Sequence, residues 1–212
     1  MLNKHKLQRI AIATSALMAF GTTQLSANAE TVTITGAIQG STCSLSQTAS
    51  GGETKSFTLG LGNVLLSTAT SSSTAGNPFG TQTNLSFSLV APGGGSACSF
   101  TNGTSGWDMA IAPAKSGFIT TINGTTFLSN MVSLAEGGTD AVVKLFGGTT
   151  ATPTNVITLT EAGSFVSSPT NPFQAKAASA ITLGAQFAQP VANQKPNSGN
   201  FNSVLNLSIN YR

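Results

Sequence analysis

Short segments in which apolar and polar residues alternate recur along this chain, and this two-residue period restricts its fold most. Leu85, Phe87 and Leu89 alternate with serines in residues 84–90, which predicts a strand with one buried face. No segment has a sustained period of 3.6 residues with capping residues, so we expect little helix. The pattern therefore predicts an all-β fold of the sandwich type.

Gly, Pro and Asn separate the alternating segments, as turns between strands require. Residues 67–83, rich in Ser, Thr and Gly, predict a surface loop, and Gly147-Gly148 predicts a turn. Nothing indicates a second domain or an internal repeat. The predicted strands lie at residues 31–45, 56–66, 84–90, 107–112, 117–122, 131–134, 141–146, 156–159, 181–188 and 203–211.

The start of the chain has the pattern of a secretory signal peptide. Basic residues precede an apolar run at residues 10–20, which is shorter than the ~20 residues that span a bilayer. Ala27-Asn28-Ala29 follows as a small-x-small cleavage site. We expect cleavage after Ala29. Cleavage after Gly21 is a second possibility, and a short N-terminal membrane anchor is the alternative to a signal peptide.

Removal of the signal changes the charge of the protein. Three of the nine basic residues and the single histidine, His5, lie within it, which leaves six basic residues to balance six acidic ones. A mature chain without net charge or a basic patch is not expected to bind nucleic acid. No second long apolar segment is present, so no membrane span is expected in the mature chain.

The mature chain is not expected to be an enzyme. Without histidine, Ser-His-Asp and Cys-His nucleophile activation are excluded, and the six carboxylates form no paired motif. Trp107 beside Asp108 admits a sugar-stacking site, although a core or interface position is the favoured interpretation for Trp107.

Two cysteines remain, Cys43 and Cys98. An even number in an exported chain favours a disulfide, because the periplasm is oxidising. Two buried free thiols are the alternative. Two cysteines without histidine cannot supply the four ligands of a structural zinc site, so neither a metal nor another cofactor is expected.

Both ends of the mature chain have strand character. The last segment carries apolar residues on one parity, interrupted only by Ser203, and polar residues mostly on the other. Taken alone, this is the closing strand of any sandwich. Residues 31–38 also alternate, with no preceding turn. An apolar strand at a chain end is an aggregation hazard unless it has a partner.

Four features occur together in this chain. They are the pattern Val32-x-Ile34-x-Gly36-x-Ile38, Cys43 seven residues after the glycine, Cys98 soon after the 84–90 strand, and a final strand with Gly199 fourteenth from the end and a penultimate Tyr211. In this combination the chain resembles the pilins of chaperone-usher pili, such as type 1 fimbrial subunits. Residues 141–148 also look like the family's mid-chain strand and turn.

The resemblance implies an incomplete immunoglobulin-like sandwich that lacks its final strand and is completed by a donated one. A periplasmic chaperone would first lend a strand, and at an outer-membrane usher an identical or related pilin subunit would replace it, which is strand addition. The implied donor residues are Val32, Ile34, Gly36 and Ile38. The implied groove lies along the C-terminal strand, at Gly199, Phe201, Leu205, Leu207, Ile209 and Tyr211.

The implied organisation is a signal peptide at 1–29, a donor extension at 30–40 and a pilin domain at 41–212. The subunit would pass through the periplasm to a fimbrium at the cell surface and support adhesion. Two departures from the family are visible. Only two residues precede Val32 after cleavage at Ala29, and 54 residues separate the cysteines, more than the family usually has.

Two other functions stay open from the sequence. One is a binding module, either a pilin-like adhesin or an exported carbohydrate-binding β-sandwich, which would be a stable monomer without a chaperone. The other is an exported hydrolase, which the missing histidine disfavours.

Overall fold

The fold is taken from a computed structural model, which describes residues 31–36, 43–47, 56–62, 66–69, 74–91, 98, 106–166 and 180–211. The predicted signal peptide and Ile38 lie outside the described residues. Within them, strands dominate, and the helical structure consists of two short 3₁₀ helices, η1 (Leu66–Thr68) and η2 (Leu134–Glu136).

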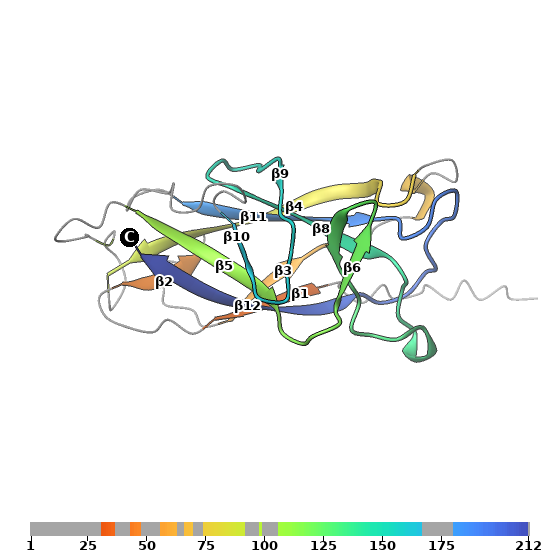
Figure 1. Cartoon of the computed structure of the whole chain (residues 1–212), viewed down its shortest axis with the longest axis horizontal. Helices are drawn as coiled ribbons and strands as arrows, with labels where there is room; N and C mark the ends of the chain where they lie inside the picture. The colour runs from red at the N-terminus through yellow and green to blue at the C-terminus, as the bar shows by residue number, and fades with distance from the viewer. Residues whose placement is uncertain are drawn as a thin grey trace, which may run out of the picture.

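The described strands form two sheets (Figure 1). The first sheet has the strand order β10-β5-β12-β1-β3. The second has the order β2-β4-β11-β8-β7-β6, with β9 paired to β8. The strands are β1 (Thr31–Gly36), β2 (Ser44–Gln47), β3 (Ser56–Gly60), β4 (Pro78–Val90), β5 (Trp107–Pro113), β6 (Ile119–Ile122), β7 (Thr125–Leu128), β8 (Val142–Gly148), β9 (Asn155–Val156), β10 (Ser164–Phe165), β11 (Ile181–Ala188) and β12 (Asn202–Tyr211).

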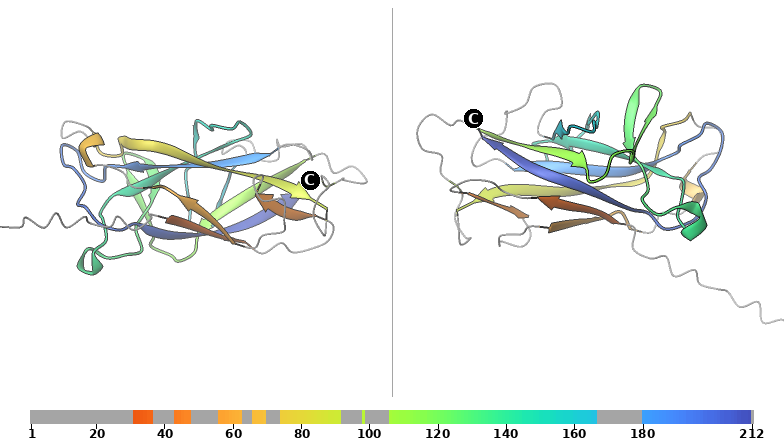
Figure 2. Two further views of the ribbon diagram at one scale, coloured as in Figure 1. Left: turned by 180° about the vertical axis from the view of Figure 1, so that it is seen from behind. Right: turned by 60° about the horizontal axis from the view of Figure 1, so that its bottom comes forward.

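The sheets lie face to face, and the main apolar core lies between them (Figure 2). Trp107 and Ile111 of β5 enter it from the first sheet, and Phe87 and Leu89 of β4 enter it from the second. In β4 the side chains from Leu85 onward alternate between buried and half-buried, as the two-residue period predicts. The all-β sandwich predicted from the sequence is therefore confirmed.

Several predicted strands are confirmed closely. Residues 181–188 coincide with β11, and β5 and β12 differ from the predicted segments by one residue at one end. In β12 and just before it, the side chains at 201, 203, 205 and 207 are buried, whereas those at 202, 206 and 208 are exposed. The alternation of the sequence therefore matches the two faces of the strand.

The predicted loop at 67–83 is wrong in its second half, because β4 already begins at Pro78. In this stretch Pro78, Phe79 and Thr83 pair with β11. Phe79 lies opposite Phe187, and the register shifts between Ala185 and Phe187. Gly80, with φ of 71°, lies in the irregular stretch, and its carbonyl accepts a hydrogen bond of 2.7 Å from the Gln186 side chain. Such an irregularity interrupts the alternation of side chains between the two faces, so the sequence shows no two-residue period there.

The predicted strand at 131–134 and the turn at Gly147-Gly148 are also wrong. Residues 131–134 are a loop that enters η2, and the two glycines end β8, paired to β11. A Cβ atom on Gly147 would overlap the carbonyl oxygen of Val166. A close backbone approach therefore explains a glycine in this strand better than a turn does.

Two short strands, β7 and β10, were not predicted. β7 pairs with β6 in a hairpin whose two turn residues are Asn123 and Gly124. Both have positive φ, 51° and 77°, as a type I′ hairpin turn requires. The Asn-Gly pair was therefore the signal in the sequence that could have found this hairpin.

Candidate functional site: the N-terminal strand and its slot

The strand at the start of the described chain lies inside a sheet rather than at its edge. β1 lies between β12, the last strand, and β3, as Figures 1 and 2 also show. It runs parallel to β12, with Thr31 opposite Asn202 and Gly36 opposite Leu207. It runs antiparallel to β3, with Thr31 opposite Gly60. We call the position between β12 and β3 the slot.

Alternation determines how β1 fits the slot. Val32 and Ile34 are fully buried, each with 0% of its surface exposed, and Thr31 and Thr33 are half-buried on the other face. Full burial of such an aliphatic side chain contributes about 1.5–3 kcal/mol. The strand thus completes both the hydrogen bonding of the sheet and part of the core.

The predicted donor and groove segments lie side by side in one chain. Val32 lies opposite Ser203 and Ile34 opposite Leu205, and the next buried residue along β12 is Leu207. Ile209 is half-buried and packs against the core. Phe201 is buried just before β12 begins, and its carbonyl accepts a hydrogen bond of 3.2 Å from the Thr31 N–H.

Two glycines of the predicted site have different surroundings. Gly36 is the last residue of β1 and pairs with Leu207, so it lies in the slot. Gly199 lies before β12, and a Cβ atom there would overlap the carbonyl of Gly138. It therefore permits a close crossing of two backbones and does not line the slot. Tyr211 ends β12 and pairs with Trp107 of β5.

Asn130 positions the start of β12, and the sequence analysis missed it. Its side-chain amide donates hydrogen bonds to the carbonyls of Thr139 (2.9 Å) and Asn200 (2.7 Å). Its side-chain oxygen accepts from the N–H groups of Val132 (3.1 Å) and Asn202 (2.9 Å). No periodic pattern reveals such a residue, because its partners come from separate parts of the chain.

The loop that carries Asn130 contains the helix η2, which a capping box of Ser133 and Glu136 stabilises. The Glu136 carboxylate accepts hydrogen bonds from the Ser133 hydroxyl (2.9 Å) and the Ser133 N–H (3.3 Å). These bonds favour the ionised form and hold the pKa of Glu136 below the usual glutamate value. The following residues reach β12, since the Gly137 carbonyl accepts a hydrogen bond of 2.9 Å from the Asn200 N–H.

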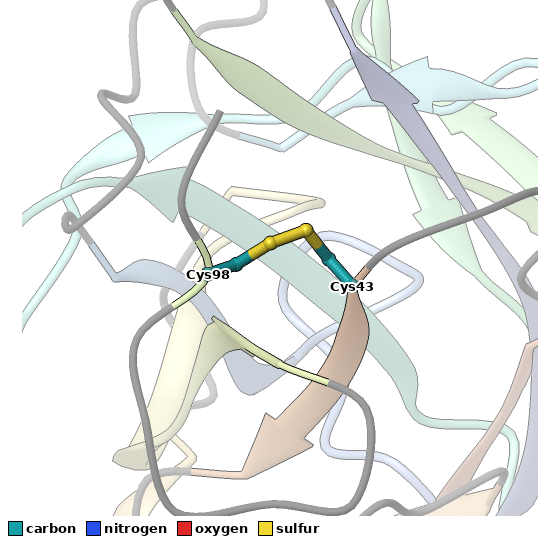
Figure 3. Close-up of a disulfide and its surroundings, with 2 residues drawn as sticks. All are labelled: Cys43 and Cys98. Carbon is teal, nitrogen blue, oxygen red and sulfur yellow. A yellow bond between two sulfur atoms is a disulfide. The ribbon is translucent and has the colours of Figure 1, made fainter. Parts of the chain in front are cut away.

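A disulfide involves the first described residue after β1. Cys43 and Cys98 are joined, with their Cα atoms 5.7 Å apart (Figure 3), so the predicted disulfide is confirmed. Cys43 directly precedes β2, and the Cys98 N–H bonds to the Leu89 carbonyl at 3.1 Å. The link therefore attaches the chain that leaves β1 to the second sheet after only six intervening residues, 37–42.

The chemistry available around the slot is apolar contact and main-chain hydrogen bonding. Among the described residues, no cluster of three or more His, Cys, Asp or Glu residues is suited to a metal ion. Trp107 has 0% of its surface exposed, so it belongs to the core, as favoured, and cannot stack on a sugar. The arrangement is suited to holding a strand.

No helix within the described ranges is both long and apolar enough to cross a membrane. Neither a protein-family model nor a curated protein sequence matches the chain. The case for a function therefore rests on the residues and on the geometry of the slot.

Proposed function

We propose that this chain is a structural subunit of a bacterial surface pilus, exported through the periplasm and assembled by strand addition. A chaperone and an outer-membrane usher would handle the subunit, and the finished fimbrium would support adhesion. In this proposal the domain is an immunoglobulin-like sandwich that is one strand short until a donor strand completes it. The role requires neither catalysis nor a cofactor.

One observation carries the proposal: β1, the first strand of the described residues, fills an interior position of a sheet. After removal of the predicted signal peptide, β1 would lie at the start of the chain and would be joined to the rest of the fold on one side only. Another molecule could therefore supply this strand without a change in the connections between the other strands. Its side chains Val32 and Ile34 are fully buried, so a sandwich without β1 would expose an apolar slot. This combination supports strand addition, in which main-chain bonds give affinity and alternate side chains give specificity.

A second candidate is a self-contained exported binding module. The same observation favours it in one respect, because β1 and its slot belong to one chain. A module of this kind needs no partner strand and would remain a monomer at any concentration. Assembly in the presence of the chaperone and usher therefore distinguishes the two functions.

The test uses a pair of complementary variants, expressed with the cognate chaperone and usher. Ile34→Arg damages the donor strand and leaves the slot intact, and Leu207→Arg damages the slot and leaves the donor intact. Each variant alone is expected to form no fibres, because a buried unpaired charge is strongly destabilising. Together they are expected to form one-to-one complexes, in which the intact donor enters the intact slot.

Thr33→Arg is the matched control, since Thr33 lies on the opposite face of β1 and is only half-buried. It should assemble into fibres of normal length. Electron microscopy of the cell surface and native mass spectrometry provide the readouts. Monomers from the wild-type chain, with no complex from the mixed variants, would favour the self-contained module and reject the pilus subunit.

A further inference from the structure

The outermost strand of the second sheet has an open edge. β6 is the last strand of that sheet, and within the described residues it pairs only with β7. The β6–β7 hairpin stands away from the body of the sandwich (Figure 2). Native proteins usually block an open edge with a charge, a proline or a bulge, whereas β6 consists of Ile119, Thr120, Thr121 and Ile122.

The register of the hairpin determines which backbone groups of this edge are free. Hydrogen-bonded and non-hydrogen-bonded pairs alternate along an antiparallel ladder. The Phe118 carbonyl accepts a hydrogen bond of 2.9 Å from the Ser129 N–H, so Phe118 belongs to a bonded pair. By alternation, the even-numbered residues of β6 direct their N–H and C=O groups toward β7. The groups of Ile119 and Thr121 point outward, away from β7.

We propose that β6 is a self-association edge, which pairs antiparallel with β6 of a second copy of this chain across a two-fold axis at Thr120. A two-fold contact uses the same residues on both sides, so Ile119 of each copy lies opposite Thr121 of the other. These are the residues whose backbone groups point outward. Each of the two symmetric pairs can therefore exchange both of its main-chain hydrogen bonds.

The side chains of this edge are also self-complementary about the axis. Phe118, Thr120 and Ile122 share one face of the strand, where Phe118 and Ile122 are half-buried and Thr120 is exposed. The axis brings Phe118 of each copy opposite Ile122 of the other, and pairs of aromatic and β-branched residues stabilise neighbouring strands. An axis at Thr121 would instead bring Phe118 opposite Gly124, which has no side chain to pack.

A second copy is the partner that this edge fits, because the match consists of the same residues in reverse order. Residues 116–128 contain no charged side chain, so the hairpin neither attracts a charged partner nor repels an identical one. The contact is small, and we expect a weak dimer that forms at high protein concentration. The edge belongs to the second sheet and the slot to the first, so the inference does not depend on the proposed function.

Single cysteines test the position of the axis in the mature protein. With Thr120→Cys, the two copies of position 120 form a non-hydrogen-bonded pair whose Cα atoms lie about 4.5 Å apart, within the range of a disulfide. Mild oxidation should give a covalent dimer, detected by mass spectrometry without reductant. The matched control is Thr121→Cys, which is adjacent and also exposed. Its two copies lie diagonally, about 7–8 Å apart, and should form no covalent dimer.

A proline tests the backbone contact. Thr121→Pro removes an outward N–H and leaves the bonds between β6 and β7, and edge strands accept proline at such a position. Each dimer then loses one hydrogen bond per copy. The dissociation constant of the dimer, measured by sedimentation equilibrium, should rise about tenfold or more, while circular dichroism of the monomer stays unchanged.

Three results would overturn the inference: a wild-type protein that remains monomeric at every concentration, equal cross-linking of the two cysteine variants, or a dimer that Thr121→Pro does not weaken. Oligomers formed through the slot do not bring two copies of position 120 together, so the cross-link separates the two kinds of association. Failure of the proposed function looks different: the dimer forms through β6, but the chain never produces fibres with its chaperone and usher.

Discussion

At the scale of single residues, three small residues in and near the slot occupy their positions for different structural reasons. Gly199 permits two backbones to cross, whereas Gly36 lies within the β1–β12 ladder. Ser203 interrupts the apolar parity of the last strand, yet it is fully buried opposite Val32. Its hydroxyl has no hydrogen-bond partner among the described groups. The slot therefore accepts one polar group at the cost of some stability.

Gly199→Ala tests the backbone crossing. The added Cβ atom would overlap the Gly138 carbonyl, and neither backbone can move without breaking the hydrogen bond between the Thr139 N–H and the Asn200 carbonyl (3.1 Å). We expect a loss of about 1–3 kcal/mol in the free energy of unfolding, measured by urea denaturation.

Gly60→Ala is the control for this change, because a Cβ atom at Gly60 meets nothing within 4 Å. It should alter the stability by less than about 0.5 kcal/mol, as surface substitutions usually do. Equal effects of the two substitutions would show that the crossing at Gly199 is not tightly packed.

At the scale of elements, β12 depends on the loop that precedes β8 as well as on its neighbouring strands. Residues 130–139 bond to its first residues through Asn130, and the Met131 N–H bonds to the Asn202 carbonyl at 2.8 Å. Glu136 caps the short helix η2 in this loop. The loop therefore fixes the end of the slot at which β1 begins.

Asn130→Ala should loosen this end of the slot. The substitution removes the side-chain partner of the Thr139 carbonyl and of the Asn202 N–H. The Asn200 carbonyl also loses this partner but keeps its hydrogen bond from the Thr139 N–H. Each part-buried polar group left unsatisfied costs about 1–3 kcal/mol, and we expect a total near the lower end, because water reaches some of them. Hydrogen exchange should increase at residues 200–202 and at Thr31.

Asn202→Ala removes an exposed side chain of the same type and retains the backbone bonds, so it serves as the control. It should leave hydrogen exchange at Thr31 unchanged. If Asn130→Ala also left this exchange unchanged, the loop would not support the slot.

At the scale of the whole molecule, one disulfide links the start of β2 to the chain beyond β4. Cys43 and Cys98 are 55 positions apart, and closing a loop of that length contributes about 4 kcal/mol in the chain-entropy model. Both residues are buried in the core. The disulfide therefore stabilises the domain and also fixes the chain at Cys43, seven positions after the end of β1 at Gly36.

Cys43→Ala with Cys98→Ala should reduce the free energy of unfolding by about 2–5 kcal/mol, as measured by urea denaturation of the purified mature protein. A loss below about 0.5 kcal/mol would contradict a structural role for the native disulfide.

The local features of this protein follow from the order of its residues. The two-residue period predicted β12 and its buried face, because alternation is a property of neighbouring residues. Apolar segments also predicted β11 and most of β5, but β11 is buried on both faces, so no period revealed a single buried face there. Two cysteines in a chain with the pattern of an exported protein were enough to predict their pairing. The sequence also marked both chain ends as strands that need partners.

The partner of each strand, in contrast, is known only from the fold. The insertion of β1 between β12 and β3, the register that brings Ile34 opposite Leu205, and the support by Asn130 all join residues that are far apart in the chain. A periodic pattern specifies a face but no neighbour. For that reason the sequence predicted that residues 31–38 form a strand, and only the fold showed that β1 lies between β12 and β3 of the same chain.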